Sequence, residues 1–364
     1  GFRYDYAQRY GAPHLMEMAK DGASTPQGML PSYPSTTFPN HIALVTGLRP
    51  EHHGIIAMEF MDPARSFEEY RYNSKTTGDG SWYQGVPIWV LAEQQGMRSA
   101  CFFWPASEAA IEGVRPTFYL HFDDTYDDAK RVDRVAAWLK LPEAERPHLI
   151  TLYYSNVDHA GHEFGPESQE TRDAVHHVDE MIGLLRERIK ASGLPVDLIV
   201  TADHGMIGTD RIPVVLDQYA DLSKFKSTGM QMYAPSEADA EKAYEEFRAH
   251  PNPKFEVYRR LDVPKELHYD ASAREGDPVV VAKGPYPIYV HAPKKQPNVG
   301  SHGFNPHTMP QMKAIFYVEG PDIRAGVKLS SFENVDVYSL LAKLLGLDAP
   351  PTDGSLRSLM PALK

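Results

Sequence analysis

Cysteine is almost absent from this sequence: Cys101 is the only one in 364 residues. An intrachain disulfide is therefore impossible. Cys101 lies in the apolar run Ala100–Trp104, and a free cysteine in such a run is usually a buried core residue. No apolar run approaches the ~20 residues that a transmembrane helix needs, so no membrane span is expected. No signal peptide is visible at Gly1, but the start without Met looks trimmed and says nothing about export.

Positive charge is also scarce. Lysine and arginine number 37 against 49 acidic residues, which gives a formal net charge of -12. A duplex nucleic acid usually binds a basic face, so this balance argues against a nucleic-acid duplex as partner. A small phosphate substrate remains possible, because bound metal ions can reverse the local sign of the charge. Repeats, low-complexity tracts and flexible linkers are missing as well, which favours a compact globular chain.

Strand-like and helix-like segments alternate along most of the chain. This alternation predicts an α/β fold with a mainly parallel sheet and helices on both of its faces. The expected strands are 98–104, 148–155, 195–201 and 313–318, and the expected helices are 14–20, 87–95, 131–139, 168–191 and 335–345.

Residues 208–298 break this alternation. They contain one clear helix, 236–250, and strand-like pieces at 255–259, 278–282 and 287–291. We therefore expect a catalytic α/β domain formed by residues 1–207 and 299–364, with residues 208–298 inserted as a smaller α+β cap region. The polar stretch 62–83 has little periodicity and is expected to be an excursion over the surface.

Four aspartates lie within residues 123–128. A calcium loop is conceivable, but the glycine and the terminal glutamate of an EF-hand are missing. The alternative is a solvated acidic face, because charge runs usually stay in water. His176 and His177 lie in the expected helix 168–191 and are interpreted as ordinary surface or packing residues.

Thr37 lies where a loop broken by Pro34 and Pro39 meets a short apolar helix that Gly47 closes. A hydroxyl beside a helix N-terminus lies in a field that favours negative charge, which suits an alkoxide nucleophile or a bound phosphate. A plain N-cap is the other interpretation. Asn40 either positions this loop or caps the helix.

Three further stretches combine possible metal ligands with glycine: Asn156–His162, Thr201–Met206 and Gly300–Gly303. The first two follow strongly β-like runs, and open α/β sheets place their sites at such strand ends. The ligands that these stretches offer are two aspartates and three histidines, a set that suits zinc: Asp158, His162, Asp203, His204 and His302.

These motifs resemble the nucleotide pyrophosphatase/phosphodiesterase family (type I phosphodiesterases) of the alkaline phosphatase superfamily. The residues that carry the resemblance are, in order, Pro34-Ser-Thr-Thr-Phe-Pro-Asn-His41, Asp158-His-Ala-Gly-His162, Ala202-Asp-His-Gly-Met206 and Ser301-His-Gly303. The match extends from Gly1–Tyr6 to Asn334–Ser339 and Asp353-Gly354, so it covers nearly the whole chain. It implies an alkaline-phosphatase-like fold.

The resemblance also implies a site with two zinc ions. Asp158, His162 and His302 would hold one ion, and Asp203 and His204 would hold the other together with the Thr37 oxygen. Contact with zinc would make the Thr37 alkoxide accessible, and its attack would give a covalent phospho-threonine that water then cleaves.

Phe38 and Tyr153 match positions where family members clamp a nucleobase between aromatic rings, and the alternative is that both are simply core residues. Two features depart from the family pattern. Family members carry an aspartate immediately before the motif that starts at Gly1, and this zinc ligand is missing from the given sequence. Met58 stands where the family has an asparagine that donates to a phosphate oxygen, and a thioether cannot donate.

The sequence therefore predicts a periplasmic or secreted hydrolase that cleaves small nucleotide-type phosphodiesters or pyrophosphates and releases a nucleoside monophosphate. The location follows from the family resemblance. Two alternatives stay open: a phosphomonoesterase, phosphonate hydrolase or sulfatase relative, and a catalytically impaired homologue that binds phosphate esters.

Overall fold

The strands in the middle of the molecule form two sheets. The computed structural model describes residues 1–364. The first sheet is parallel, in the order β5-β4-β6, and the second has the order β17-β1-β16-β7. In the second sheet β1 and β17 are parallel, whereas β16 runs antiparallel to both of its neighbours. The strands are β1 (Ala23–Ser24), β4 (Ser99–Phe102), β5 (Phe118–Leu120), β6 (Leu149–Leu152), β7 (Leu198–Thr201), β16 (Phe316–Glu319) and β17 (Val327–Lys328).

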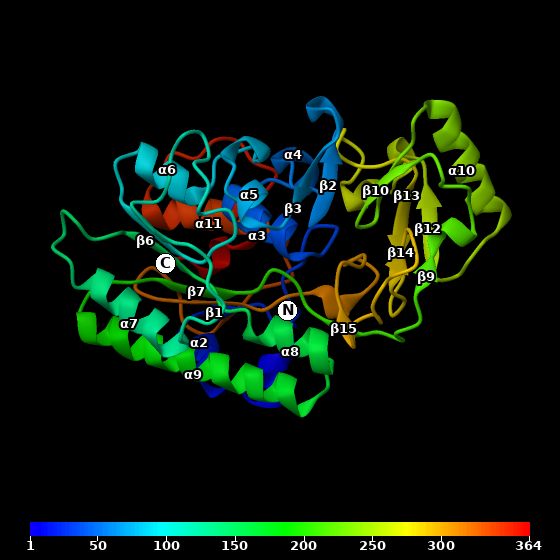
Figure 1. The fold of residues 1–364 in the computed structure, drawn as a ribbon. Helices are drawn as coiled ribbons and strands as arrows, with labels where there is room; N and C mark the ends of the chain where they lie inside the picture. Colours follow the sequence, from blue (N-terminus) through cyan, green and yellow to red (C-terminus); the bar gives the residue numbers. More distant parts are fainter.

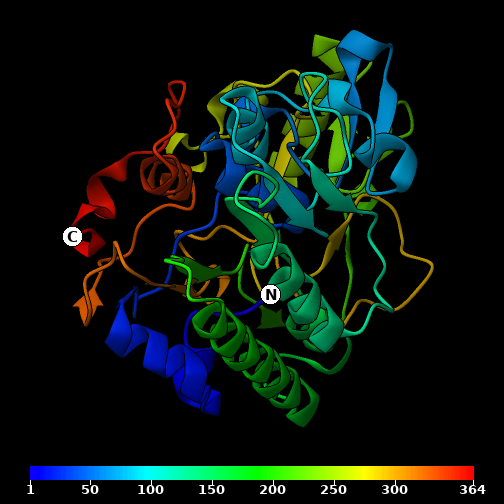
Figure 2. The same cartoon turned by 90° about the vertical axis from the view of Figure 1, so that its left-hand side faces the viewer.

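Helices cover both faces of these strands (Figures 1 and 2). On one side lie α3 (Thr37–Thr46), α6 (Ile88–Gln94) and α11 (Asp336–Leu345). On the other side lie α2 (Pro13–Asp21), α7 (Asp128–Leu139), α8 (Asn156–Phe164) and α9 (Gln169–Ser192). The predicted α/β class with helices on both faces is confirmed.

The long helix α9 shows how the sequence encodes these layers. The Ser168 side chain accepts from the Thr171 amide at the N-terminus, and Gly193 ends the helix in the left-handed region at φ 69°. Val175, Val178, Ile182 and Leu185 are buried and recur at helical spacing. This apolar stripe packs α9 onto its neighbours α2, α7 and α8.

The cap region (residues 208–298) lies beside the α/β layers (Figure 1). Its helix α10 (Glu237–Ala249) and its strands surround an apolar cluster of their own, which includes Leu216, Phe247, Phe255 and Val280. The division at residues 208 and 298 stays a prediction. The strands are β9 (Val214–Val215), β10 (Lys226–Thr228), β11 (Gln231–Tyr233), β12 (Phe255–Tyr258), β13 (Val279–Ala282) and β14 (Ile288–Tyr289).

The prediction of a surface excursion over residues 62–83 is confirmed only in part, because most of these residues are exposed or half-buried but the segment forms regular elements and is anchored in the core. Strands β2 (Glu59–Asp62) and β3 (Glu68–Arg71) form a hairpin, and α5 (Ser74–Thr77) follows it. Phe60, Tyr70 and Trp82 are almost fully buried and contact one another. Single aromatic residues separated by charged ones anchor this segment, and such isolated anchors leave no periodic pattern in the sequence.

The remaining short elements are α1 (Tyr6–Tyr10), α4 (Pro50–His53) and the paired strands β8 (Ile207–Gly208) and β15 (Gly300–Ser301). Cys101 is buried, as predicted. None of the helices combines the length and the apolar character that crossing a membrane requires.

Candidate active site

Thr37 is the first residue of α3. Thr36 precedes it in an extended conformation and occupies the N-cap position without a side-chain cap hydrogen bond. The N-cap of the helix is thus Thr36 and not Thr37. The Thr37 hydroxyl lies 3.2 Å from Nε2 of His204, a residue 167 positions away in the chain.

Asn40 braces the loop that carries Thr37. Its side-chain amide donates to the carbonyl oxygens of Pro34 and Thr36 at 3.0 and 2.9 Å. Its Oδ1 accepts from the Ser32 amide and from the Asn334 side chain, each at 2.8 Å. Asn40 is fully buried, so these bonds fix the loop in a low-dielectric environment. Of the two roles open at the sequence level, positioning of the loop is the one observed.

Asp158, His162 and His302 offer ligand atoms that all lie within 4.8 Å of one another. Asp158 and His162 are one turn apart on α8, and His302 follows β15. A Cβ on Gly300 would lie 2.1 Å from the carbonyl oxygen of Gly161, so glycine at 300 lets β15 approach α8 this closely. The two histidine Nε2 atoms are 3.0 Å apart.

The chemistry of these three side chains fits a metal ion. Nδ1 of His162 lies 2.9 Å from the Gly300 carbonyl oxygen, and Nδ1 of His302 lies 2.9 Å from the Ser35 carbonyl oxygen. A carbonyl only accepts, so both Nδ1 atoms carry the proton and both Nε2 lone pairs face the cluster. The buried Oδ1 of Asp158 has no hydrogen-bond partner. An orphaned carboxylate oxygen beside two imidazole lone pairs is a zinc-type donor set.

A second group directly follows β7. Oδ2 of Asp203 lies 2.9 Å from Nε2 of His204. The His204 ring stacks on the His302 ring with centroids 3.6 Å apart, so the two groups adjoin. The amino group of Gly1 lies 3.0 Å from Oδ1 of Asp203 and 3.8 Å from Oδ1 of Asp158. A residue attached before Gly1 would therefore enter the space between the two groups.

The electrostatics keep these side chains in the states that bind a metal ion. Burial alone would raise the pKa of Asp158, but nearby positive charge, including that of the neighbouring histidines, outweighs it and lowers this pKa. Burial and the neighbouring His204 hold the pKa of His302 well below its usual value. Near neutral pH the carboxylate is thus ionised and this imidazole is neutral.

A cavity of about 1180 Å³ opens beside these residues, between the α/β layers and the cap region. Phe38 and Tyr153, predicted as a base clamp, both line it, and Tyr153 packs edge-on against His41. Sequence reasoning missed further aromatic side chains that line the cavity, among them Tyr72, Trp104 and Phe122. Tyr72 and Phe122 are 63% and 51% exposed, unusually high for aromatic rings. Of these three residues, only Trp104 could have been expected near the site from the sequence, because it ends the apolar run 100–104.

Met58 lies directly over the start of α3. Its sulfur accepts from the Phe38 amide at 3.3 Å. This contact places position 58 next to Thr37, where the family resemblance expects a phosphate contact. A thioether accepts but cannot donate, so this side chain supplies no hydrogen bond to a phosphoryl oxygen.

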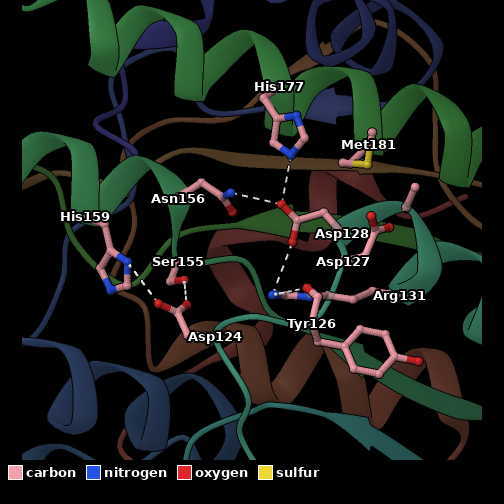
Figure 3. Close-up of a pocket in the computed structure, with 11 residues that line it drawn as sticks. Asp124, Tyr126, Asp127, Asp128, Arg131, Ser155, Asn156, His159, His177 and Met181 are labelled. Atoms are coloured by element: carbon pink, nitrogen blue, oxygen red, sulfur yellow. Dashed lines mark hydrogen bonds and ion pairs between the residues drawn. The ribbon is translucent and has the colours of Figure 1, made fainter.

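The aspartate run has several structural roles, and one member, Asp124, also lines the large cavity. Asp123, Asp124 and Asp127 are exposed, and the Asp127 side chain caps α7. Asp128 is not solvated, because it accepts from the side chains of Asn156 and His177 and pairs with the buried Arg131 (Figure 3). The solvated-face interpretation holds for three of the four residues. His177 ties α9 to this network and His176 contacts the Tyr10 carbonyl oxygen, so both are packing residues as predicted.

Comparisons with known proteins indicate the family of this chain. The family model described as type I phosphodiesterase / nucleotide pyrophosphatase matches residues 1–305. Human ectonucleotide pyrophosphatase/phosphodiesterase family member 1 is 35% identical over 386 residues, which cover 100% of this chain and 41% of that protein. Mouse family member 7 is 34% identical, with 100% of this chain and 85% of that protein covered. The chain thus spans about two fifths of the length of the first relative.

Solved structures show the same fold. Murine ectonucleotide pyrophosphatase / phosphodiesterase 5 has a TM-score of 0.92 and 29% sequence identity, and the match covers 100% of this chain and 98% of that one. An inactive variant of the same murine protein, with threonine replaced by alanine, was solved in complex with AMP and also has a TM-score of 0.92, at 28% identity, covering 100% of this chain and 97% of that one. On these grounds the chain belongs to the type I phosphodiesterase / nucleotide pyrophosphatase family, a family of hydrolases.

Proposed function

We propose that this protein hydrolyses nucleotide-type phosphodiester or pyrophosphate bonds in a metal-dependent reaction, through a phospho-threonine intermediate on Thr37, and releases a nucleoside monophosphate. The observation that carries the proposal is the position of the Thr37 hydroxyl. It lies at the start of α3, 3.2 Å from His204 and beside the cluster of Asp158, His162 and His302.

Two zinc ions are proposed as cofactors. Asp158, His162 and His302 would hold one, and Asp203 and His204 would hold the other together with Thr37. When bound, they would lower the pKa of the nucleophile and stabilise charge on the phosphoryl oxygens. An aspartate before Gly1 would complete the second group, because the Gly1 nitrogen lies between Asp158 and Asp203.

The residues of the chain account for the remaining chemistry. Oγ1 of Thr37 attacks phosphorus and the bond to the leaving group breaks, which leaves the nucleoside monophosphoryl group on the threonine. Water then breaks the new bond between phosphorus and the threonine oxygen and restores the hydroxyl. The N-terminus of α3 favours the negative charge that develops at this place. The hydrogen bonds of Asn40 hold the loop in position through both steps.

A nucleotide suits the cavity because aromatic faces accept any base. Phe38 and Tyr153 are proposed to hold the base, and the AMP complex of the murine relative supports a nucleotide ligand. The relatives are named as ectoenzymes, which supports a periplasmic or secreted location.

Zinc-loaded protein should be assayed with bis(p-nitrophenyl) phosphate and with p-nitrophenyl phosphate. The proposal expects a higher kcat/KM for the diester and loss of activity on exhaustive chelation. Preference for the monoester would favour a phosphomonoesterase. Tight zinc binding without turnover of either compound would indicate an impaired homologue. Equal activity with and without chelation would exclude the metal-dependent scheme.

A further inference from the structure

The wall of the large cavity carries no lysine or arginine. It carries four acidic side chains, Glu59, Glu108, Asp124 and Asp158, and two histidines outside the metal cluster, His121 and His159, which lie beside Glu108 and Asp124. Asp158 belongs to the proposed metal cluster, and Glu108 and Asp124 lie near the exposed Phe122. The Glu59 carboxylate lies on the side of the cap region, because its Oε2 accepts from the hydroxyl of Thr228 at 3.4 Å.

Two cations near the cavity, Arg71 and Lys254, contact other groups. Arg71 pairs with Glu69 at 2.8 Å and reaches Glu59 only at 3.9 Å. Lys254 lies over the outer face of the Tyr286 ring, 4.7 Å from its centroid. Neither side chain lines the cavity. An anionic group far from Thr37 would therefore meet no lysine or arginine in this wall.

The side of the cavity formed by the cap region is apolar. It presents Met230, Val279, Val280 and Ile288, with the rings of Tyr286 and Tyr289. Ala57 and Met58 continue this surface next to Thr37. Such a wall favours burial of an uncharged group over a hydrated anion.

These features bear on the leaving group of the proposed reaction. The two groups of metal ligands adjoin Thr37 and would neutralise the phosphoryl group under attack. A nucleoside triphosphate would also bring a pyrophosphate group, whose charges would lie against the apolar wall and Glu59. Charges that leave water without a partner are strongly disfavoured, and repulsion from a carboxylate adds to the cost.

We infer that the site selects phosphodiesters with a single negative charge, in which one ester group is a nucleoside and the other is uncharged and apolar, and that it discriminates against nucleoside triphosphates. This inference rests on the proposed function and specifies its substrate class. The apolar side of the cap region binds the uncharged leaving group, and Glu59 repels a polyphosphate.

Two thymidine compounds provide the test, because they transfer the same group to Thr37. One is the p-nitrophenyl ester of thymidine 5′-monophosphate, with an apolar leaving group, and the other is dTTP, with pyrophosphate. Free zinc should be buffered so that dTTP does not strip the metal. The inference expects kcat/KM for the ester to exceed that for dTTP by at least about tenfold.

The p-nitrophenyl ester and dTTP differ in intrinsic reactivity. Charge variants remove this difference, because the rate of each compound with a variant is compared with its own rate with the parent protein. Glu59→Lys should shift the ratio of the two kcat/KM values toward dTTP by about tenfold or more, and Glu59→Gln should shift it by less. Glu68→Lys makes the same charge change on β3 at an exposed position outside the cavity, and it should leave the ratio unchanged. If Glu59→Lys fails to fold, Glu59→Gln still decides the direction.

Equal or faster hydrolysis of dTTP by the parent would overturn the inference and leave the proposed function standing. A ratio that neither Glu59 variant moves would also overturn it. If neither thymidine compound is cleaved while an aryl monophosphate is, the proposed function itself fails. Binding to zinc-loaded Thr37→Ala gives an independent readout, in which the ester should bind more tightly than dTTP.

Discussion

Glu275 makes the stability of the protein depend on pH in a way that the structure predicts. This side chain lies where the cap region meets α4, and only 3% of its surface is exposed. Its Oε2 accepts from the Ser272 amide, whereas its buried Oε1 has no partner. Burial, with the nearby carboxylate of Glu51, raises the pKa of Glu275 from 4.5 to about 8.

The sign of the effect follows from proton linkage. Between about pH 4.5 and pH 8 the folded protein keeps the Glu275 proton, while the unfolded chain has lost it. The free energy of unfolding therefore falls as pH rises through this window and stays level above it. A pKa difference of 3.5 units corresponds to a loss of at most about 5 kcal/mol.

Glu275→Gln removes this titration. The free energy of unfolding of the variant minus that of the parent should increase by several kcal/mol between about pH 5 and pH 9. Urea unfolding of chelated protein at each pH measures it, and the subtraction cancels the titration of all other groups. Glu266→Gln, at an exposed position in the same segment, is the control and should give a flat difference. A flat difference for Glu275→Gln as well would refute the assignment of a buried, protonated carboxyl group.

Three further predictions concern the site. Met58→Asn places a hydrogen-bond donor beside Thr37 and should raise single-turnover rates on a nucleotide diester at least about tenfold, since a lost donor of this kind typically costs ~10²–10³-fold. An unchanged or lower rate would show that position 58 serves another substrate. His302→Ala should weaken one zinc site without emptying the other, and metal analysis that finds both sites unchanged would contradict the assignment of His302. After chelation of the parent protein, zinc should restore activity better than magnesium, because imidazole ligands favour zinc. Extension of the chain by an aspartate before Gly1, with its preceding strand, should raise the affinity for zinc at Asp203 and raise turnover. Zinc affinity equal to that of the present chain would mean that another residue fills this role.

The sequence was most informative where ligands directly follow strands. Asp158 comes after β6 and Asp203 after β7, and the ends of such strands meet at one edge of an α/β fold. The grouping of Asp158, His162 and His302 came from the family resemblance, and their ligand atoms do lie within 4.8 Å of one another. The sequence shows a glycine at position 300, but it does not show that this glycine meets the carbonyl oxygen of Gly161, because that contact joins residues far apart in the chain.

Features that depend on tertiary contacts escaped sequence reasoning. Tyr72 and Phe122 reach the cavity from segments without a periodic pattern, and only the folded arrangement brings them near Phe38 and Tyr153. Asp128 looked like part of a charged run, but Arg131 and His177 give it partners from two different helices. Residue periodicity does not indicate the direction of a strand, so the antiparallel orientation of β16 could not be predicted from the sequence.

Covalent attack by Thr37 is the central claim, and trapping the intermediate tests it most directly. Zinc-loaded protein is mixed with a nucleotide diester, quenched in acid within one turnover, digested and analysed by mass spectrometry. The account predicts a nucleoside monophosphoryl group on the peptide that contains Thr37, no such group in Thr37→Ala, and reduced turnover that persists in Thr37→Ser. Turnover of Thr37→Ala at the parent's rate, or parent turnover without any modified peptide, would contradict it.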